Sequence, residues 1–462
     1  MKKRFLALLV AMVMVLGMSM TAMAASITIN STAAEGTTDK TAYTAWMLLN
    51  ASIETAPEVG LDGSTTNQDE TKVAYYTTSA TAKAALEDAG LFTFSAADTE
   101  GRYWATPVDG LSAEDVTGAF DDWTEAQMNA AFGTKYTGAQ TTAGGSATIN
   151  CGDDGYYFIK STLGDQIAVQ TIGEVTINTK NSYPSGDKTV PEADANSQIG
   201  QEITYTLTVN VPASANDQIV LTDTMSKGLT FVEVVSQDGL TGTVGDVEAA
   251  ENGATKFTIT YTADQVKDFT GTITVLVKVK VNADAAIDTE IPNTLDIDYG
   301  NNYSAKPVTT NTQTTHATFD KVDGSTKLSG AKFKLKDGEG NYVNLVEVTA
   351  GEVYRVATDA DTTTTQEMTT AGKQITINGL DADIDYSLEE TKAPDGGYNA
   401  LTEDVPLEKE GTTFINTEIE NNKGTVLPST GGIGTTIFYI IGAVLVLGAG
   451  ILLVTRRRMN VN

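Results

Sequence analysis

Three residues in the middle of the chain carry groups that could react with one another: an amine, a carboxyl and an amide. Lys188 lies at the start of one expected strand, Asp223 shares the apolar parity of a second, and Asn301 shares that of a third. Because successive side chains of a strand point to opposite faces, the three groups are expected to enter the core together. Burial of unpaired polar groups costs free energy, so we expect them to bind one another or to become neutral.

Such a set of groups could form a covalent bond. Burial lowers the pKa of a lysine and raises the pKa of an aspartate, which favours the neutral amine and the protonated acid. The amine is then a nucleophile, and the protonated carboxyl can polarise the amide carbonyl and shuttle a proton while ammonia leaves. The expected product is an intramolecular isopeptide bond between Lys188 and Asn301, formed autocatalytically with Asp223 as the acid. The alternative is a buried ion pair between Lys188 and Asp223.

A second set of the same three groups lies nearer the C-terminus. Lys321 supplies the amine and Glu390 the acid, whereas Glu389 has the opposite parity and is expected to face solvent. Asn421 shares the parity of Ile419 and is the preferred acceptor. A bulge at the end of that strand would bring Asn422 inward instead.

The elements that must position these groups are β-strands. Residues 203–211 and 273–281 alternate between apolar and mostly polar side chains. Alternation of this length predicts strands with one buried face, and therefore a β-sandwich over 181–306. Residues 307–423 repeat the pattern and predict a second immunoglobulin-like unit. The expected fold class is mainly β, with tandem immunoglobulin-like β-sandwich domains.

The region before these two domains has a mixed pattern. Residues 43–49 and 155–160 are rich in aromatic and apolar residues and predict strands. Between them, the alanine-rich segment 80–88 and a capping-box spacing that begins at Thr124 predict two helices. We therefore expect an N-terminal α+β domain over 25–180, with helical insertions around a β core. Lys40 is a candidate amine for a further crosslink there, but no acid and acceptor stand out beside it.

The first 24 residues have the pattern of a secretory signal peptide. Residues 2–4 are basic, residues 5–20 are largely apolar, and small residues follow up to Ala24. This order predicts export and cleavage after Ala24. The polar segment that follows directly argues against a membrane anchor at this end.

The last segment, 424–462, has another ordered pattern. A pentapeptide precedes an apolar stretch over 437–454 and three arginines at 456–458. About 18 apolar residues are just enough to cross a bilayer as a helix, and the arginines favour a cytoplasmic end. The pentapeptide consists of Leu427, Pro428, Ser429, Thr430 and Gly431. The order resembles the sorting signal of sortase substrates, which implies that a cysteine transpeptidase cuts between Thr430 and Gly431 and passes the Thr430 carbonyl to an amine.

Two internal segments carry a further resemblance. Residues 386–394 read Tyr-Ser-Leu-Glu-Glu-Thr-Lys-Ala-Pro and, with Lys-Val-Asp at 321–323, resemble the collagen-adhesin B-type domains of Gram-positive surface proteins. Residues 221–229, Leu-Thr-Asp-Thr-Met-Ser-Lys-Gly-Leu, resemble the isopeptide-forming second domain of sortase-assembled backbone pilins. With both termini, the resemblance covers about two-thirds of the chain. It implies a lysine, an acid and an asparagine in each of two domains, at the positions named above.

Backbone pilins of this family also carry an acceptor lysine before the second domain. Lys180, Asn181, Pro184 and Lys188 fit the spacing that the family shows, which implies Lys180 as the acceptor amine. Asn-Thr replaces the usual Tyr-Pro before Lys180, so the motif departs from the family pattern there. The alternative is a solvated lysine at a domain boundary.

The composition disfavours several functions. The chain has 30 basic and 60 acidic side chains, and removal of both ends takes away six basic residues, leaving 30 − 6 = 24. This balance disfavours nucleic acid and anionic lipid as partners. The single cysteine, Cys151, allows no intrachain disulfide, and the single histidine, His316, leaves no His-rich metal site or Ser-His-Asp set. We expect no enzyme, no cofactor and no metal, because the acidic loops at 151–155 and 359–361 lack the full spacing of a calcium loop.

The leading hypothesis is a backbone pilin of a Gram-positive bacterium, in which Thr430 is joined to Lys180 of the next subunit. The expected partners are a pilus-specific sortase, neighbouring pilin subunits and, through a housekeeping sortase, peptidoglycan. The expected location is the cell surface, after secretion and a transient stay of the precursor in the membrane. The alternative is a minor pilin or singly wall-anchored adhesin that binds a host ligand and needs no acceptor lysine.

Overall fold

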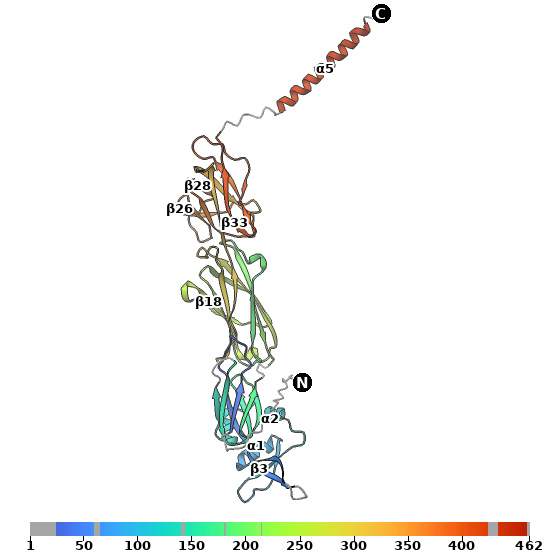
Figure 1. Ribbon diagram of the computed structural model, residues 1–462, viewed down its shortest axis with the longest axis vertical. Coiled ribbons are helices and arrows are strands. Elements are labelled where there is room, and N and C mark those ends of the chain that lie inside the picture. Colours follow the sequence, from blue (N-terminus) through green and yellow to red (C-terminus); the bar gives the residue numbers. More distant parts are fainter. Residues whose placement is uncertain are drawn as a thin grey trace. The chain divides into compact units, whose positions relative to one another are not determined.

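The computed structural model describes residues 25–59, 65–139, 144–179, 182–213, 215–423 and 433–459 (Figure 1). The chain divides into two compact units, Met1–Thr315 and His316–Asn462. Both consist mainly of β-strands arranged in facing sheets, as the sequence predicted. Among the described residues, no helix is long and apolar enough to cross a membrane.

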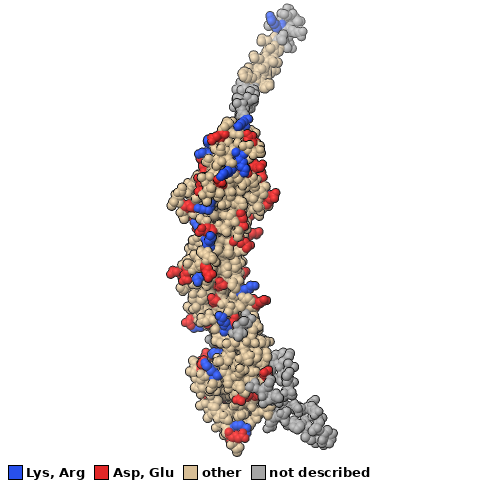
Figure 2. Space-filling model, turned by 60° about the vertical axis from the view of Figure 1, so that its left-hand side comes forward, with Lys and Arg blue, Asp and Glu red and all other residues tan. Residues whose placement is uncertain are grey.

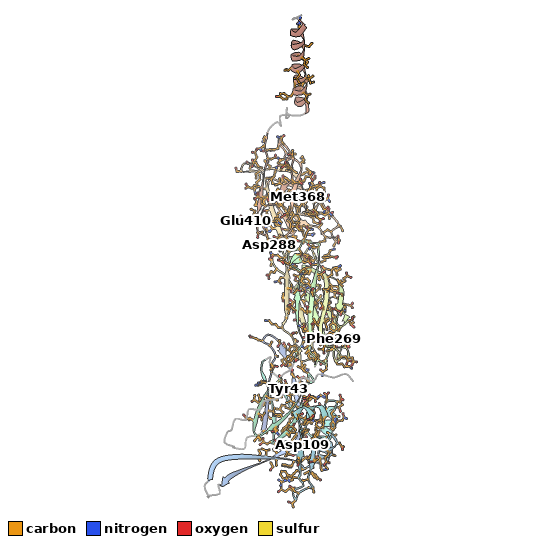
Figure 3. The ribbon with its side chains drawn as sticks, turned by 90° about the vertical axis from the view of Figure 1, so that its right-hand side faces the viewer. Tyr43, Asp109, Phe269, Asp288, Met368 and Glu410 are labelled. Atoms are coloured by element: carbon orange, nitrogen blue, oxygen red, sulfur yellow. The ribbon has the colours of Figure 1, made fainter. Side chains whose placement is uncertain are left out.

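The first sandwich of unit Met1–Thr315 has two sheets. A three-stranded sheet has the order β11-β1-β8, and a larger sheet has the order β10-β9-β3-β4-β6-β5, with β7 paired to β3. Ile27, Ile149 and Tyr43, which is labelled in Figure 3, are 0% exposed between them. The strands are β1 (Ala25–Asn30), β3 (Ala42–Val59), β4 (Thr65–Thr77), β5 (Phe92–Phe94), β6 (Tyr103–Pro107), β7 (Tyr136–Ala139), β8 (Ser146–Gly152), β9 (Gly155–Ser161), β10 (Gln166–Thr171) and β11 (Glu174–Asn178).

Three helices cover the other face of the larger sheet. Leu86 of α1 (Ala80–Asp88) and Val116 of α2 (Ala113–Ala119) belong to one core cluster with Trp46 and Phe158 of the sheet. Met128 of α3 (Glu125–Phe132) completes this cluster. α1 and α3 coincide with the two helical segments expected from the sequence, whereas α2 corresponds to no expected element.

The second sandwich of this unit contains the alternating segments of the sequence. Its sheets have the orders β12-β13-β19-β15 and β16-β18-β14-β20-β21-β2, with β17 on β18 and β22 on β20. Burial alternates along β13 and β19, which confirms the strands predicted at 203–211 and 273–281. The elements are β2 (Thr38–Asp39), β12 (Ser185–Thr189), β13 (Glu202–Val211), β14 (Ile219–Met225), β15 (Leu229–Asp238), β16 (Thr243–Val244), β17 (Glu248–Ala249), β18 (Thr255–Tyr261), α4 (Ala263–Val266), β19 (Gly271–Val281), β20 (Ile291–Tyr299), β21 (Tyr303–Ser304) and β22 (Val308–Thr312).

Unit His316–Asn462 is a separate sandwich followed by a helix. One sheet has the order β24-β23-β29-β27-β26 with β34 on β23, another has the order β28-β25-β30-β31, and β32 pairs with β33. β34 runs parallel to β23, so the first and last strands of this sandwich are neighbours. The elements are β23 (Thr315–Asp323), β24 (Thr326–Lys327), β25 (Ser329–Lys336), β26 (Leu345–Thr349), β27 (Val353–Val356), β28 (Glu367–Ala371), β29 (Ile375–Leu380), β30 (Ser387–Lys392), β31 (Val405–Pro406), β32 (Lys409–Glu410), β33 (Thr413–Phe414), β34 (Asn416–Glu420) and α5 (Ile433–Met459).

The charged side chains are dispersed on the face of the molecule that Figure 2 presents. Acidic and basic groups are interspersed there, and no broad basic patch gathers on that face. A mixed surface of this kind is soluble and offers no electrostatic footprint for a polyanion on the face in view.

Candidate functional site

β12 carries the first predicted amine into the core of the second sandwich. Lys188 is 3% exposed, and its strand pairs with β13 at the edge of the four-stranded sheet. Gly186, two residues earlier, faces the same way, and a Cβ added there would lie 2.3 Å from Cδ1 of Ile297 on β20. Only glycine lets β12 approach β20 so closely, and this approach brings the Lys188 side chain between the sheets.

Asp223 on β14 is the partner of this amine. Lys188 Nζ lies 2.5 Å from Asp223 Oδ2, and the two side chains are 0% and 1% exposed. The buried ring of Tyr205, on the neighbouring strand β13, has its centroid 4.9 Å from the same nitrogen. The contact between lysine and acid that the sequence predicted is therefore present and removed from water.

Burial changes the ionisation of both partners. It lowers the pKa of Lys188 to about 8, although the charges of Asp223 and Asp296 and the hydrogen bond to Asp223 oppose the shift. It raises the pKa of Asp223, although Lys188 and Asn293 oppose this shift. Both shifts favour the neutral amine and the protonated acid that attack on an amide requires.

The prediction that Asn301 enters the core is wrong. β20 ends at Tyr299, and the chain then turns through Gly300, whose φ of 55° lies in the left-handed region, to return as β21. Asn301 lies in this turn and is exposed. Alternation predicts which way a side chain faces only within a strand, and β20 ends before Asn301.

Asn293, at the other end of β20, occupies the position expected of the acceptor. It is 0% exposed and shares the parity of Leu295, which pairs directly with Asp223. Its side chain therefore lies on the inner face beside Asp223, and its two amide atoms lack a hydrogen-bond partner of good geometry among the described residues. The sequence contained this signal, because Asn293 begins the same inward series that leads to Asn301.

A hydroxyl group on β22, the strand that pairs with the asparagine's strand β20, is hydrogen-bonded to the strand of the lysine, β12. Thr310 on β22 pairs with Asn293 in register, and its Oγ1 donates a hydrogen bond to the Lys188 carbonyl oxygen at 2.5 Å. Four strands, β12, β14, β20 and β22, thus gather an amine, an acid and an amide into one buried cluster.

The second predicted set is assembled in unit His316–Asn462. Lys321 Nζ on β23 lies 3.2 Å from Glu390 Oε1 on β30, and both side chains are 0% exposed. The other oxygen of Glu390 accepts a hydrogen bond from the main-chain N–H of Leu401 at 2.7 Å, which fixes the carboxyl. Burial lowers the pKa of Lys321, against the opposing charge of Glu390. The ring of Phe333 lies over the amine at 5.7 Å.

Asn421 faces the core beside this pair, and Asn422 does not. Asn421 is 2% exposed, whereas Asn422 is exposed. β34 runs parallel to β23 with Ile419 opposite Lys321, and the Asn421 N–H donates to the Val322 carbonyl at 2.9 Å. This bond continues the strand pairing without a bulge, so the prediction that Asn421 is the buried residue is confirmed. Its Nδ2 has no hydrogen-bond partner within the described part of the chain.

A third set of the same residue types lies on β23, β24 and β34, and we call it the exposed set because its lysine is open to water. Lys327 Nζ lies 2.7 Å from Asp320 Oδ1, and Asn416 Nδ2 donates to Asp320 Oδ2 at 3.2 Å. The Lys327 side chain is 42% exposed, so water solvates its ammonium group. Contact among a lysine, an acid and an asparagine is therefore not distinctive by itself. Burial separates the two inner sets from this one.

Several predicted residues lie outside the described part of the chain. These are the signal peptide up to Ala24, the acceptor Lys180 with Asn181, and the pentapeptide 427–431. Lys40, the candidate amine of the first sandwich, is exposed. No lysine among the described side chains of residues 25–179 is buried, so nothing there parallels the two inner sets.

The acidic loops do not gather metal ligands. Among the residues that the structure describes, no three His, Cys, Asp or Glu side chains are placed to share a metal ion. Asp361 instead binds Arg355, with Oδ1 2.7 Å from Nη2. Cys151 is 1% exposed in the core of the first sandwich, where burial raises the pKa of its thiol to about 11.

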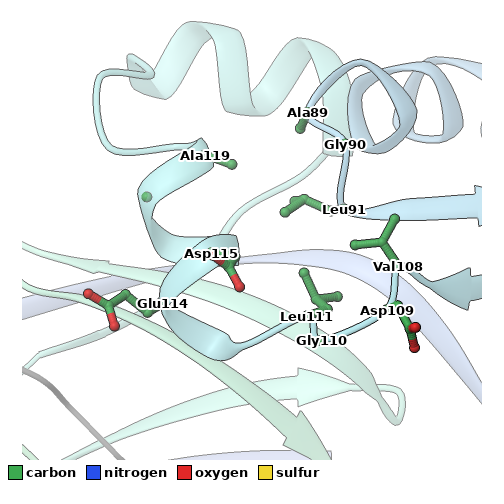
Figure 4. A pocket seen from close by; sticks show the side chains of 11 residues that line it. Ala89, Gly90, Leu91, Val108, Asp109, Gly110, Leu111, Glu114, Asp115 and Ala119 are labelled. Carbon is green, nitrogen blue, oxygen red and sulfur yellow. The ribbon is translucent and has the colours of Figure 1, made fainter.

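A hollow of about 660 Å³ lies beside α1 and α2 in the first sandwich (Figure 4). Leu91, Val108 and Leu111 contribute apolar side chains to its lining. The Asp115 carboxyl belongs to the cap of α2, because its Oδ2 accepts hydrogen bonds from the N–H and the hydroxyl of Ser112. The lining residues therefore offer no nucleophile paired with a base.

Comparison with known proteins yields two family matches. Residues 315–423 match the SpaA family, described as a prealbumin-like fold domain. Residues 419–461 match the LPXTG cell wall anchor motif, which includes the pentapeptide 427–431. A curated relative is the trypsin-resistant surface T6 protein of Streptococcus pyogenes serotype M6, which is 25% identical over 379 residues, 60% of this chain and 70% of the relative.

Solved pilin structures also resemble the chain. The full-length major pilin SpaD of Corynebacterium diphtheriae is 19% identical, with 87% of this chain and 98% of that chain covered and a TM-score of 0.44. The pilus 2b backbone protein of group B streptococcus is 26% identical, with 52% and 99% covered and a TM-score of 0.38. With TM-scores below 0.5, these likenesses support no statement about function. The two family matches show that the chain carries a prealbumin-like fold domain over residues 315–423 and a cell wall anchor motif over 419–461.

Proposed function

We propose that the chain is the backbone subunit of a covalent surface pilus and that an isopeptide bond closes each of its last two sandwiches. The burial of two lysine–acid–asparagine sets supports this proposal more than any other observation. In each set an amine contacts a carboxyl inside a sandwich, beside a buried asparagine whose Nδ2 has no hydrogen-bond partner of good geometry among the described residues. The sets are Lys188, Asp223 and Asn293, and Lys321, Glu390 and Asn421.

The proposed reaction uses only groups of this chain. The neutral amine of Lys188 attacks Cγ of Asn293, while the protonated carboxyl of Asp223 donates a hydrogen bond to the amide oxygen. Asp223 then relays a proton from the attacking nitrogen to the leaving nitrogen, so the Cγ–Nδ2 bond breaks and ammonia departs. The carboxyl is regenerated, a bond between Nζ and Cγ has formed, and no oxidant or cofactor is consumed. The second set reacts in the same way.

Each isopeptide bond would close a loop covalently in a chain that has no intrachain disulfide. The loops between positions 188 and 293 and between 321 and 421 hold about 100 residues each, and closing such a loop contributes about 4 kcal/mol by analogy with a disulfide. Under tension the stabilisation is larger, because two strands joined by a covalent bond cannot be pulled apart. β23 and β34 are the first and last strands of their sandwich. A bond between them would carry tension directly from one strand to the other, without loading the strands in between.

We propose that polymer growth uses the two signals of the sequence. A sortase cysteine attacks the Thr430 carbonyl and displaces the amine of Gly431, which leaves a thioester. The amine of Lys180 on a neighbouring subunit then attacks this thioester, forms an amide and expels the thiol. The anchor match supports the donor half of this scheme, and the spacing around Lys180 supports the acceptor half. The last subunit would pass to peptidoglycan through a housekeeping sortase.

The intact mass of the secreted chain tests the two internal bonds. We expect a mass below that of the processed sequence by two molecules of ammonia. Asn293→Ala and Asn421→Ala should each restore one ammonia after correction for the substitution. Asn416→Ala, at the exposed set, is the matched control and should leave both losses in place. A wild-type chain at its full sequence mass would contradict the proposal.

A further inference from the structure

A short segment of unit His316–Asn462, residues 395–401, follows β30 and contacts the strands that carry the second lysine–acid–asparagine set. We call this segment the strap. It begins where the Asp395 N–H donates to the Ser329 carbonyl on β25 at 3.1 Å. Gly396 and Gly397 follow with φ of 106° and 85°, values that glycine adopts without strain. The two glycines make a turn that leads the chain to Tyr398.

Tyr398 joins the ends of the two strands that carry the amine and the asparagine. Its hydroxyl donates to Asp323 Oδ2 at 2.8 Å, and Asp323 lies two residues after Lys321 on β23. Tyr398 also forms an antiparallel bridge with Lys423, which lies two residues after Asn421. The Lys423 Nζ is 4.6 Å from the centroid of the tyrosine ring. One residue therefore holds both strand ends just beyond the two groups that would react.

Asn421 needs this support because it lies where the pairing of the last strand ends. β34 ends at Glu420, and the Asn421 N–H still donates to the Val322 carbonyl at 2.9 Å. Chain segments fray where their pairing stops. The strap contacts the next residue, since the Asn399 N–H donates to the Asn422 carbonyl at 3.4 Å. The chain on the far side of Asn421 is thus supported by the strap and not by β23.

The far end of the strap orients the acid. The Leu401 N–H donates to Glu390 Oε2 at 2.7 Å, whereas Glu390 Oε1 lies 3.2 Å from Lys321 Nζ. A main-chain N–H can only donate, so Oε2 serves as its acceptor and Oε1 is left to carry the proton of the acid. The hydrogen bond from Leu401 therefore directs the proton-carrying oxygen toward the amine.

We propose that the strap is a positioning element for the second internal bond, in which Tyr398 aligns the amine with the amide and the N–H of Leu401 aligns the acid. Groups held in contact react without a further loss of freedom, and a small misplacement slows them strongly. This inference rests on the proposed function and adds two positions outside the reacting set. The first set differs, because Asp223 Oδ1 lacks a hydrogen-bond partner of good geometry among the described residues.

The test follows both proposed internal bonds in the same molecules. The full chain is made by cell-free synthesis, samples are quenched in acid and denaturant at intervals, and peptide mapping quantifies each crosslink. The first bond is an internal reference, because its groups belong to the other compact unit. Tyr398→Phe removes the hydrogen bond to Asp323, and Leu401→Pro removes the N–H. We expect each to slow the second bond about fivefold or more relative to the first.

Three comparisons separate positioning from general stability. Asp323→Asn keeps an acceptor for the Tyr398 hydroxyl, so it should restore most of the rate that Asp323→Ala loses. Tyr342→Phe removes a hydrogen bond of the same kind, to Glu389 Oε2 at 2.5 Å, and should leave the ratio of the two rates unchanged. Leu401→Ala keeps the N–H that Leu401→Pro removes, so the difference between these two variants reports the N–H. Tyr398→Phe keeps its ring and should fold even if Leu401→Pro does not.

Three results would overturn the inference. One is a second bond that forms at the wild-type rate, relative to the first, in folded Tyr398→Phe and Leu401→Pro chains. Another is an equal delay in Tyr342→Phe, or an equal delay of both bonds, which would indicate a general effect on folding. The third is a wild type in which residues 321 and 421 stay unlinked, which would remove the proposed second bond together with the role of the strap.

Discussion

Among the described residues, Lys188, Lys321 and Lys327 each lie within hydrogen-bonding or ion-pair distance of a carboxyl oxygen beside an asparagine, and they differ in their access to water. The side chains of Lys188 and Lys321 are 0% exposed, and that of Lys327 is 42% exposed. Burial removes the hydration of an ammonium ion and so favours the neutral amine, which alone has the lone pair that attacks a carbonyl. At the scale of the residue, burial decides which contacts are able to become covalent bonds.

The acids of the two inner sets give the first prediction at this scale. Asp223→Asn and Glu390→Gln keep the size of each side chain but remove the proton relay, so each should abolish one internal bond and restore one ammonia to the intact mass. Loss of a bond should lower the free energy of unfolding by about 4 kcal/mol, which lowers the melting temperature of a domain of this size by on the order of 20 °C.

A neighbouring residue supplies the matched control. Glu389 lies on the outer face of β30, where its carboxyl contacts Lys336 at 3.1 Å. Glu389→Gln should therefore leave both ammonia losses and the melting temperature close to those of the wild type. Retention of both bonds in Asp223→Asn would show that the carboxyl has no part in the reaction.

At the scale of the element, the spacing between strands sets the geometry of the first set. β12 belongs to one sheet and β20 to the other, and the lysine of one must reach the asparagine of the other across the core. Gly186 permits this, because any larger residue would contact Ile297 and the carbonyl of Thr208. The hydrogen bond from Thr310 to the Lys188 carbonyl then joins β12 to β22, the strand that pairs with β20.

Gly186→Ala tests the role of this spacing. The added Cβ would lie 2.3 Å from Ile297 and 2.6 Å from the Thr208 carbonyl oxygen, so β12 must move outward. We expect a destabilisation of about 1–3 kcal/mol and a fraction of molecules that keep the ammonia of the first set, both measured on the same sample by denaturation and intact mass. Gly118→Ala is the control, because nothing lies within 4 Å of its added Cβ. An unaltered mass and stability in Gly186→Ala would refute the importance of the close approach.

At the scale of the whole molecule, the chain combines a wall anchor motif with sandwiches that contain no disulfide. The single cysteine is buried and unpaired in the described structure, so any covalent crosslink within the chain would need another chemistry. Two internal amide bonds and one intermolecular amide would make the load-bearing path of a fibre covalent from subunit to subunit. A fibre that transmits tension between subunits would need this continuity.

Lys180→Arg tests the intermolecular bond on intact cells. Arginine keeps the positive charge but is not an acyl acceptor, so the ladder of high-mass species in wall extracts should collapse to a single surface-attached species. Lys40→Arg is a suitable control, since Lys40 is exposed in the same unit. Persistence of the ladder in Lys180→Arg would place the acceptor elsewhere. A wild type without any ladder would favour the singly anchored adhesin.

Much of the fold and part of the site followed from local patterns. Strict alternation located β13 and β19 and identified their inner faces, because a strand that packs on one side must alternate. The same parity placed Lys188, Asp223 and Lys321 in the core, where they are. These residues lie within strands, so their facing depends only on the residues next to them.

The errors and omissions lie where distant segments meet. The end of β20 at Tyr299 turned Asn301 outward and left Asn293 as the residue beside Asp223, and no local pattern marks where a strand stops pairing.

The sequence by itself therefore determined the buried parity of the strands and the anchor motif near the C-terminus, and it led to the hypothesis of an amide-forming chemistry. Only the tertiary structure decided where β20 ends and therefore which asparagine, Asn293, lies beside Asp223. The physical reason is that alternation within a strand sets which way a side chain faces, whereas the packing of segments distant in the sequence sets strand ends, register and hydrogen-bond partners.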